Sequence, residues 1–312
     1  MSSWKRVRFL YRRLTALAVR KTAKAIKPTR SVCGFHSSRT FAALNPSLDT
    51  DQDTGSIFRY SEQHSTSLPD KFAHLHASSI AAYPTSADKT VSALQGRLLQ
   101  LLMRMTRPRL VLELGCFMGY SAMAMADGMP EGTTLYTCEK DAKAAHLARD
   151  LFVRHGYHTS SAEGQPVSIE LLEGEAMKSL QDLASKGLQF DAVFLDADKG
   201  NYINYFNFIL DNDLLTPHGY ILADNVLFRG MVLQSQAERD SLPSPPASPQ
   251  LAPQSDGSGS GLKQKRAKTS SQRTADHVDA FNKHVKDDPR VEVVVLPIFD
   301  GLSIIMKRQG KR

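Results

Sequence analysis

Charged and polar residues directly follow two apolar runs of the sequence. One run, FDAVFLDADK, breaks off at Asp196, Asp198 and Lys199, and a later run ends at Asp224 and Asn225. Each residue alone is more often a turn or cap residue. If both runs are parallel strands of one sheet, their carboxyl ends border the same crevice. Mg²⁺, Mn²⁺ and Ca²⁺ take carboxylate and amide oxygens as ligands. We therefore predict that Asp196, Asp224 and Asn225 bind a divalent cation, with Mg²⁺ as the first candidate.

Two glycines lie after an earlier apolar run, in the segment ELGCFMGYS. Gly115 and Gly119 allow a tight turn and a close approach of the backbone to a ligand, and the following helix directs N–H groups toward it. A purely structural turn is the alternative. The pattern is not G-x-G-x-x-G, which argues against a dinucleotide. Glu139 follows about 20 residues later, where a carboxylate accepts ribose hydroxyls of an adenosine, and Ala176 ends the segment EGEA, where a small residue suits an adenine ring.

The elements that must position these residues alternate along the chain. Apolar runs that read as strands occupy residues 110–114, 134–139, 167–172, 192–195, 220–223, 291–296 and 302–306. Helical stretches separate most of them, including residues 121–126, 140–155 and 202–210. Strands that alternate with helices imply right-handed crossovers and a mainly parallel sheet. We therefore predict an α/β, Rossmann-like doubly wound sheet of about seven strands with helices on both faces.

Two features complete this expected fold. The last two runs are joined by PIFDG without a helix, which predicts an antiparallel C-terminal hairpin. Residues 87–105 are expected to form a helix that begins near Ser86, with its apolar face made by Leu94, Leu98, Leu101 and Leu102.

Both appendages of this domain, which we place at residues 49–312, have biased compositions. Residues 1–48 contain eleven Lys or Arg and no Asp or Glu, so the remainder carries 28 basic and 32 acidic residues. Amphipathic, Arg-rich and acid-free, this leader is typical of a mitochondrial transit peptide, and a disordered basic tail or a membrane-surface helix is the alternative. Without import the protein would be cytoplasmic. A Pro-, Ser- and Gly-rich insertion at about 236–274 is expected to be disordered.

Bulk composition excludes several other classes of protein. No run reaches the ~18 apolar residues that a membrane-spanning helix needs. The three cysteines lack the spacing of metal ligands, so no zinc site is expected, and their odd number argues against a disulfide framework. The acidic balance outside the leader argues against a nucleic-acid partner, with KQKRAK as the local exception.

Several motifs together resemble a known family. TSAD at residues 85–88, LELGCFMGYSA, FLDADKGNY, ADNVLFRG and DPRVEVVVLPIFDGLSIIMKR occur in this order and span roughly residues 68–308. In this the chain resembles the cation-dependent O-methyltransferases typified by caffeoyl-CoA O-methyltransferase, which are class I enzymes that use S-adenosylmethionine. Catechol O-methyltransferase is a more distant relative.

The resemblance implies roles for particular residues. Asp196, Asp224 and Asn225 would bind the metal, and Lys199 would be the catalytic base beside Asp196. The S-adenosylmethionine pocket would be lined by Thr85, Glu113, Gly115, Ser121, Glu139, Ala176 and Asp198. The family also implies a homodimer. The enlarged loop after ADNVLFRG lies where relatives select the acceptor, so acceptor identity is not inherited.

Chemistry agrees with these implied roles. A phenol with a pKa of ~10 is mostly protonated at neutral pH, and chelation of two vicinal oxygens by a dication favours the phenolate and orients it. The same charge would lower the pKa of Lys199 and make a neutral amine available. Tyr202 and Phe228 are candidates for apolar walls around the aromatic acceptor.

We therefore expect methylation of a hydroxyl in a small catechol-like vicinal diol. Two alternatives stay open: methylation of a hydroxylated tRNA nucleoside, and a non-catalytic module that binds S-adenosylmethionine or a partner. Retention of the three metal ligands and Lys199 argues against the module.

Overall fold

The computed structural model of the protein describes residues 54–86, 89–157, 167–233 and 268–308. The predicted leader, residues 1–48, and most of the predicted insertion lie outside the described residues. No helix of the described part is long and apolar enough to cross a membrane.

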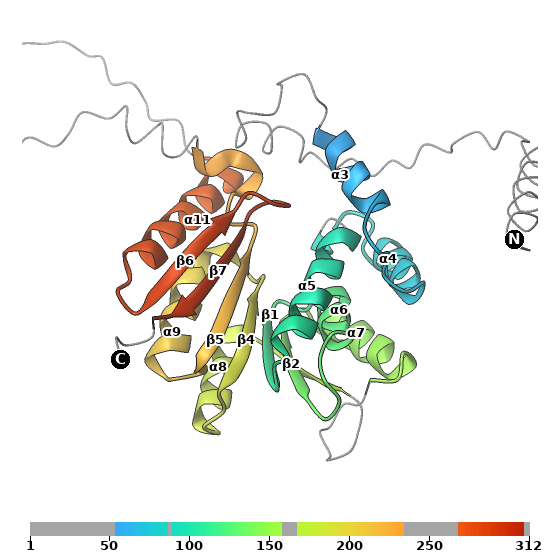
Figure 1. The fold of residues 1–312 in the computed structure, drawn as a ribbon, viewed down its shortest axis with the longest axis horizontal. Coiled ribbons are helices and arrows are strands. Elements are labelled where there is room, and N and C mark those ends of the chain that lie inside the picture. The colour runs from blue at the N-terminus through green and yellow to red at the C-terminus, as the bar shows by residue number, and fades with distance from the viewer. Residues whose placement is uncertain (1–53, 87–88, 158–166, 234–267, 309–312) are drawn as a thin grey trace, which may run out of the picture. The chain divides into compact units, whose positions relative to one another are not determined.

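A seven-stranded sheet forms the centre of the described domain (Figure 1). Its strands follow the order β3-β2-β1-β4-β5-β7-β6. The first five pair in parallel, and β7 pairs antiparallel with both β5 and β6. This confirms the predicted fold and its C-terminal hairpin. The strands are β1 (Leu110–Leu114), β2 (Thr134–Glu139), β3 (Ser168–Glu173), β4 (Phe190–Leu195), β5 (Leu215–Asp224), β6 (Val291–Leu296) and β7 (Leu302–Lys307).

Helices pack on both faces of the sheet, and each face has its own apolar core. One core unites residues of α4 (Lys71–Ala82), α5 (Ala93–Thr106), α6 (Tyr120–Ala126) and α7 (Ala142–Arg154) with the sheet. The other unites α8 (Ala176–Ser185), α9 (Tyr202–Asp211) and α11 (Ser270–Asp287) with it. Helix α3 (Thr54–Gln63) and the short 3-10 helices η2 (Lys199–Asn201) and η3 (Phe228–Gly230) complete the elements. Because the central strands β1 and β4 are buried on both sides, their apolar runs are nearly continuous.

Helix α5 departs from its prediction in both its start and its buried face. It begins at Ala93, where the Ser92 side chain accepts a hydrogen bond from the backbone N–H of Gln95 and caps the helix. Its buried residues are Gln95, Gly96, Leu99, Gln100 and Met103, whereas Leu101 is 41% exposed. Leu98 and Leu102 are partly buried and pack against the core, so the predicted face is confirmed for these two residues and wrong for Leu101. Gly96 determines the orientation, because a Cβ there would lie 2.9 Å from the Tyr120 ring of α6.

The end of the predicted insertion also needs correction. Residues 270–274 belong to α11 rather than to a disordered segment. Thr269 and Gln272 form a capping box, in which the Thr269 side chain accepts from the Gln272 N–H and the Gln272 side chain accepts from the Thr269 N–H. These bonds satisfy backbone donors that would otherwise be unpaired, which fixes the helix start despite the polar composition of SSQRT.

Candidate active site

The turn after β1 lies directly against the end of β4. Gly115 has a φ of +101°, and a Cβ there would be only 2.2 Å from the backbone carbonyl oxygen of Asp196. The N–H of Asp196 in turn donates to the carbonyl of Leu114 at 2.9 Å. Glycine is therefore required at position 115 by conformation and by space. The contact brings the predicted cofactor loop and the predicted metal ligands to one edge of the sheet.

Glu113 is the buried polar centre beneath this loop. Its side chain is fully buried and accepts hydrogen bonds from Ser121 Oγ, at 2.5 Å, and from Thr137 Oγ1. Burial raises the pKa of Glu113 to about 7, although the two hydroxyl donors act to lower it. Glu113 and Ser121, both expected to line the cofactor pocket, are in contact, and their bond ties β1 to the first turn of α6.

Glu139 stands at the carboxyl end of β2, facing the same loop. Its Oε2 accepts from the backbone N–H of Phe117 at 2.6 Å, and its Oε1 accepts from the N–H of Asp141 at 2.8 Å. Ala176 is the first residue of α8 and is buried. Gly174, just before it, has a φ of +128° and no atom within 4 Å of a hypothetical Cβ. The strand ends of β2 and β3 therefore offer a carboxylate beside open space.

The last two predicted cofactor residues are exposed. Asp198 accepts hydrogen bonds from Tyr205 Oη at 2.7 Å and from Asn201 Nδ2 at 2.6 Å, which hold its carboxylate at the start of η2. Thr85 lies in a turn after α4 and shares no hydrogen bond with the other predicted residues in the described part of the chain. Six of the seven predicted cofactor residues thus lie at or just beyond the carboxyl ends of β1 to β4, whereas Thr85 lies in the turn after α4.

Lys199 is held by an acid and a phenol. Its Nζ donates to Asp196 Oδ1 at 2.8 Å and to Tyr202 Oη at 2.6 Å. The Tyr202 hydroxyl lies 3.0 Å from the carbonyl oxygen of Leu195 and 3.2 Å from that of Asp224. Tyr202 therefore links Lys199 to the ends of both β4 and β5. The side chains of Lys199 and Asp196 are only 12% and 17% exposed, so this ion pair is partly shielded from water.

The pKa of Lys199 is shifted opposite to the sequence-based expectation. Burial lowers the pKa of Lys199, but Asp196, Tyr202 and Asp224 raise it by more, so that the net shift is upward. The prediction of a lowered pKa included the positive charge of a divalent cation. The protein's own groups act in the other direction and favour the ammonium form.

Asp224 and Asn225 end β5 beside this ion pair. Asp224 is 2% exposed, and its Oδ1 accepts from the backbone N–H of Asn225 at 2.8 Å. Burial raises the pKa of Asp224, and the nearby charge of Asp196 raises it further. Asn225 has a φ of +55°, which asparagine tolerates better than most residues. Two mutually repelling carboxylates and an amide form an all-oxygen set that fits a hard divalent cation.

The described residues contain no group of three or more His, Cys, Asp or Glu side chains placed to hold a metal ion. The predicted set therefore depends on the amide of Asn225 as its third protein ligand.

Sequence reasoning missed the role of Tyr202. It was expected to line the acceptor, but it is completely buried, packs edge-to-face against Phe281 at 5.2 Å and uses its hydroxyl to anchor Lys199. No local signal distinguishes this role from packing, because the partners come from three separate segments. Phe228 is partly exposed in η3, so it stays a candidate for an acceptor wall.

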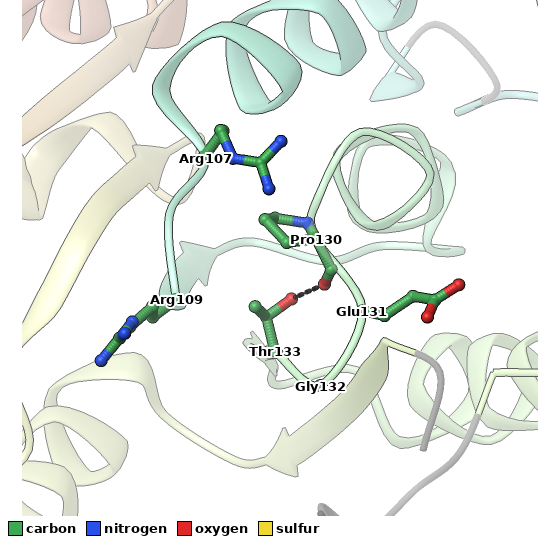
Figure 2. A pocket seen from close by; sticks show the side chains of 6 residues that line it. All are labelled: Arg107, Arg109, Pro130, Glu131, Gly132 and Thr133. Atoms are coloured by element: carbon green, nitrogen blue, oxygen red, sulfur yellow. Dashed lines mark hydrogen bonds between the residues drawn. The ribbon is translucent and has the colours of Figure 1, made fainter. Parts of the chain in front are cut away.

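A pocket at the opposite end of the sheet is separate from this site. Figure 2 shows its lining residues, which come from the turns that precede β1 and β2: Arg107, Arg109, Pro130, Glu131, Gly132 and Thr133. The amino ends of parallel strands lie away from the ligand crevice of such a fold. The pocket is therefore not part of the candidate active site.

Comparison with known proteins shows the family of this chain. A model of the family described as O-methyltransferase matches residues 62–244. The chain belongs to the O-methyltransferase family. O-methyltransferase ankF of Aspergillus thermomutatus is 32% identical over 256 residues, which cover 82% of this chain and 94% of that protein. Caffeoyl-CoA O-methyltransferase of Eucalyptus gunnii is 28% identical over 222 residues, or 70% of this chain and 74% of the relative. These findings confirm the family resemblance and the expected enzyme class.

Solved structures of related proteins share the fold. The methyltransferase PaMTH1 of Podospora anserina, solved with SAH bound, matches with a TM-score of 0.64 and 29% identity, covering 84% of this chain and 98% of that one. The O-methyltransferase from Bacillus cereus, solved in complex with SAH, matches with a TM-score of 0.61 and 24% identity, covering 81% and 97%. At its lower identity, the second match supports the fold alone.

Proposed function

We propose that this protein transfers the methyl group of S-adenosylmethionine to one hydroxyl of a small catechol-like vicinal diol, in a reaction that requires a divalent cation. The observation that carries the proposal is the meeting of Asp196, Asp224 and Lys199 at two adjacent strand ends, directly against the glycine turn at Gly115. Methyl transfer is an in-line displacement, which needs a nucleophilic oxygen and a methyl donor held side by side.

Binding of the methyl donor is supported by the residues around the glycine turn. Glu139 would accept ribose hydroxyls, Ala176 would contact the adenine, and Asp198 would border the far side of the crevice. Buried Glu113 and Ser121 would hold the turn beneath the methionine part. The related Podospora anserina methyltransferase holds SAH, which is what S-adenosylmethionine becomes when it has given up its methyl group.

Asp196, Asp224 and Asn225 would hold the cation. When bound there, a divalent cation supplies positive charge that favours the ionised form of an acceptor hydroxyl. Relief of the repulsion between Asp196 and Asp224 would favour its binding. Compensation of these two charges would also lower the pKa of Lys199, so that Nζ would release a proton to solvent, and the neutral amine would then accept the proton of the acceptor hydroxyl.

The choice of a vicinal diol follows from the geometry of chelation. Two adjacent oxygens of one acceptor form a chelate with a single cation, whereas a monophenol offers only one. Relatives named catechol O-methyltransferase and caffeoyl-CoA O-methyltransferase support this acceptor class.

The test is methyl transfer from labelled S-adenosylmethionine by the full chain. Catechols and matched monophenols are offered with Mg²⁺ or with EDTA. The proposal expects labelling of catechols only, and only with Mg²⁺. Equal labelling with EDTA would overturn metal dependence. Binding of S-adenosylmethionine without labelling of any diol would overturn the diol acceptor and favour either a nucleoside acceptor or a non-catalytic protein.

We also propose that the protein is a homodimer. Because α5 buries the face with Gln95, Leu99 and Met103, its residues Leu101 and Met105 are 41% and 76% exposed. Val294 on the edge strand β6 is 49% exposed. The end of α5 lies against β5, because the Thr106 hydroxyl is 2.9 Å from that of Tyr220. Strand β5 is in turn joined to the edge strand β6 through β7. An apolar surface of this kind is typical of an interface. Sedimentation should show a dimer that Met105→Glu converts to a monomer, and a monomeric parent chain would contradict it.

Residues 1–48 are proposed to direct the protein to mitochondria. The support is their composition, because an acid-free, Arg-rich amphipathic segment is what import recognises. Residues 1–48 fused to a fluorescent protein should reach mitochondria, and the same fusion with its arginines replaced by glutamine should stay in the cytosol. Cytosolic fluorescence of both would overturn this proposal.

A further inference from the structure

Helix α5 places one polar residue in an otherwise apolar stripe. Gln95, Leu99 and Met103 recur at the spacing of one helix face, and they are 5%, 0% and 0% exposed. The Gln95 side-chain nitrogen Nε2 is buried and has no hydrogen-bond partner within 3.5 Å. A buried amide without a partner costs about 1 to 3 kcal/mol. Such a group in a native core calls for an explanation.

The register between α5 and β5 shows where this amide lies. Thr106, near the end of α5, contacts Tyr220 on β5 through their hydroxyls, at 2.9 Å. From Tyr220 to Asp224 the strand rises about 13 Å, and from Thr106 back to Gln95 the helix rises about 16 Å. Tyr220, Leu222 and Asp224 share one face of the strand because side chains alternate. Gln95 therefore lies level with Asp224, within reach of its side chain.

Electrostatics agrees with this placement. The nearby Gln95 amide acts to lower the pKa of Asp224, whose net shift is upward through burial and the charge of Asp196. The Asp224 carboxyl otherwise has one backbone donor, the N–H of Asn225, on Oδ1. The carboxyl is thus held by Asn225 on one side, and the Gln95 amide approaches it from α5 without a hydrogen bond of 3.5 Å or less.

We propose that Gln95 is a positioning residue whose unpaired amide donates to the Asp224 carboxylate when a divalent cation binds, and so holds that carboxylate in its binding orientation. This rests on the proposed metal-dependent function. Carboxylates that bind metals are themselves held by hydrogen bonds, and loss of such a partner weakens metal affinity by about 10- to 100-fold. Gln95 itself does not bind the cation or the acceptor.

The experiment is a titration of the full chain with Mn²⁺, followed by the electron paramagnetic resonance signal of the free ion. Gln95→Met keeps the length and helix propensity of the side chain and removes the amide. It should raise the Kd for Mn²⁺ by about 10-fold or more, while kcat at saturating metal and KM for a catechol stay near the parent values. Gln95→Asn, whose amide is one methylene too short, should be intermediate.

Gln100→Met is the matched control. Gln100 is buried on the same helix, 2% exposed, and its carbonyl oxygen accepts from Arg97 rather than from a group at the site. It should leave the Kd for Mn²⁺ unchanged even if it lowers the denaturation midpoint.

The outcomes separate the two proposals. If the parent chain binds Mn²⁺, and Asp224→Ala does not, but Gln95→Met and Gln95→Asn bind as the parent does, the role of Gln95 is overturned while the proposed function stands. If Gln95→Met changes only KM for the catechol, Gln95 contacts the acceptor instead, and the positioning role is again overturned. If the parent chain neither binds Mn²⁺ nor depends on metal, the proposed function itself fails.

Discussion

Gly115 and Asp196 are in contact through their backbones, at a position where even one additional methyl group would not fit. A Cβ on Gly115 would lie 2.2 Å from the Asp196 carbonyl oxygen, and the residue also has a φ of +101°. The turn that is proposed to bind the methyl donor and the strand end that is proposed to bind the metal therefore form one rigid unit.

Gly115→Ala is expected to disrupt both functions together. The left-handed backbone conformation alone costs about 1 to 3 kcal/mol, and relief of the contact must move the end of β4. We expect a lowered urea midpoint, weaker S-adenosylmethionine binding and loss of metal-dependent transfer. Gly187→Ala is the control, because Gly187 has a φ of +67° but no atom within 4 Å of its hypothetical Cβ. An equal effect of the two substitutions would show that backbone strain, and not the contact with Asp196, is responsible.

Lys199→Ala should reduce turnover far more than cofactor affinity, because Lys199 contacts Asp196 and Tyr202 rather than the glycine turn. Lys199→Arg separates charge from proton transfer, since a guanidinium keeps the ion pair but does not release its proton near neutral pH. Turnover is measured from pH 6 to 9 at saturating Mg²⁺, and both variants should be nearly inactive. A parent-like pH profile in either variant would remove Lys199 as the base.

Tyr202→Phe and Tyr205→Phe form a matched pair of hydroxyl deletions on α9. Tyr202 positions Lys199, so its loss should lower kcat and leave KM for S-adenosylmethionine nearly unchanged. Tyr205 holds Asp198 at 2.7 Å, so its loss should raise that KM with little change in kcat. Steady-state kinetics with varied S-adenosylmethionine measures both values. The same kinetic change in both variants would mean that the hydroxyls support only the packing of α9.

Glu113→Gln should change how stability depends on pH. The pKa of Glu113 is about 7 in the folded state against an ordinary value of 4.5, so between these values the folded protein binds the proton and the unfolded chain does not. Stability therefore falls as pH rises from 4.5 to 7, by roughly 3 kcal/mol from this group, and stays level above that. The Gln variant should lose this part of the decline.

Urea unfolding of the cofactor-free protein at pH 5 and pH 7.5 measures the difference. The raised pKa of Asp224 contributes a decline of the same sign in both proteins, so only the difference between them reports Glu113. Glu131→Gln, an exposed change in the loop before β2, is the control and should keep the parent's slope. A Glu113→Gln slope equal to the parent's would show that Glu113 is ionised in the folded state at pH 5.

The sequence by itself determined the order of elements, the mainly parallel sheet and the edge at which the chemistry lies. These follow from local properties: alternating apolar runs and helical stretches, glycines where the backbone must turn, and acidic residues at the ends of β4 and β5. Neighbouring parallel strands bring such ends together, so the grouping of Asp196 and Asp224 was predictable without coordinates.

Only the tertiary structure decided which face of α5 is buried and in which direction the pKa of Lys199 is shifted. The buried face of α5 depends on the approach of Gly96 to Tyr120 on α6, which placed Gln95 in the core and Leu101 outside. The upward shift of the Lys199 pKa depends on its distances to Asp196 and Asp224, residues 3 and 25 positions away in the chain. Packing and electrostatics act between atoms that are near in space, and a linear pattern specifies which residues are polar but not which of them meet.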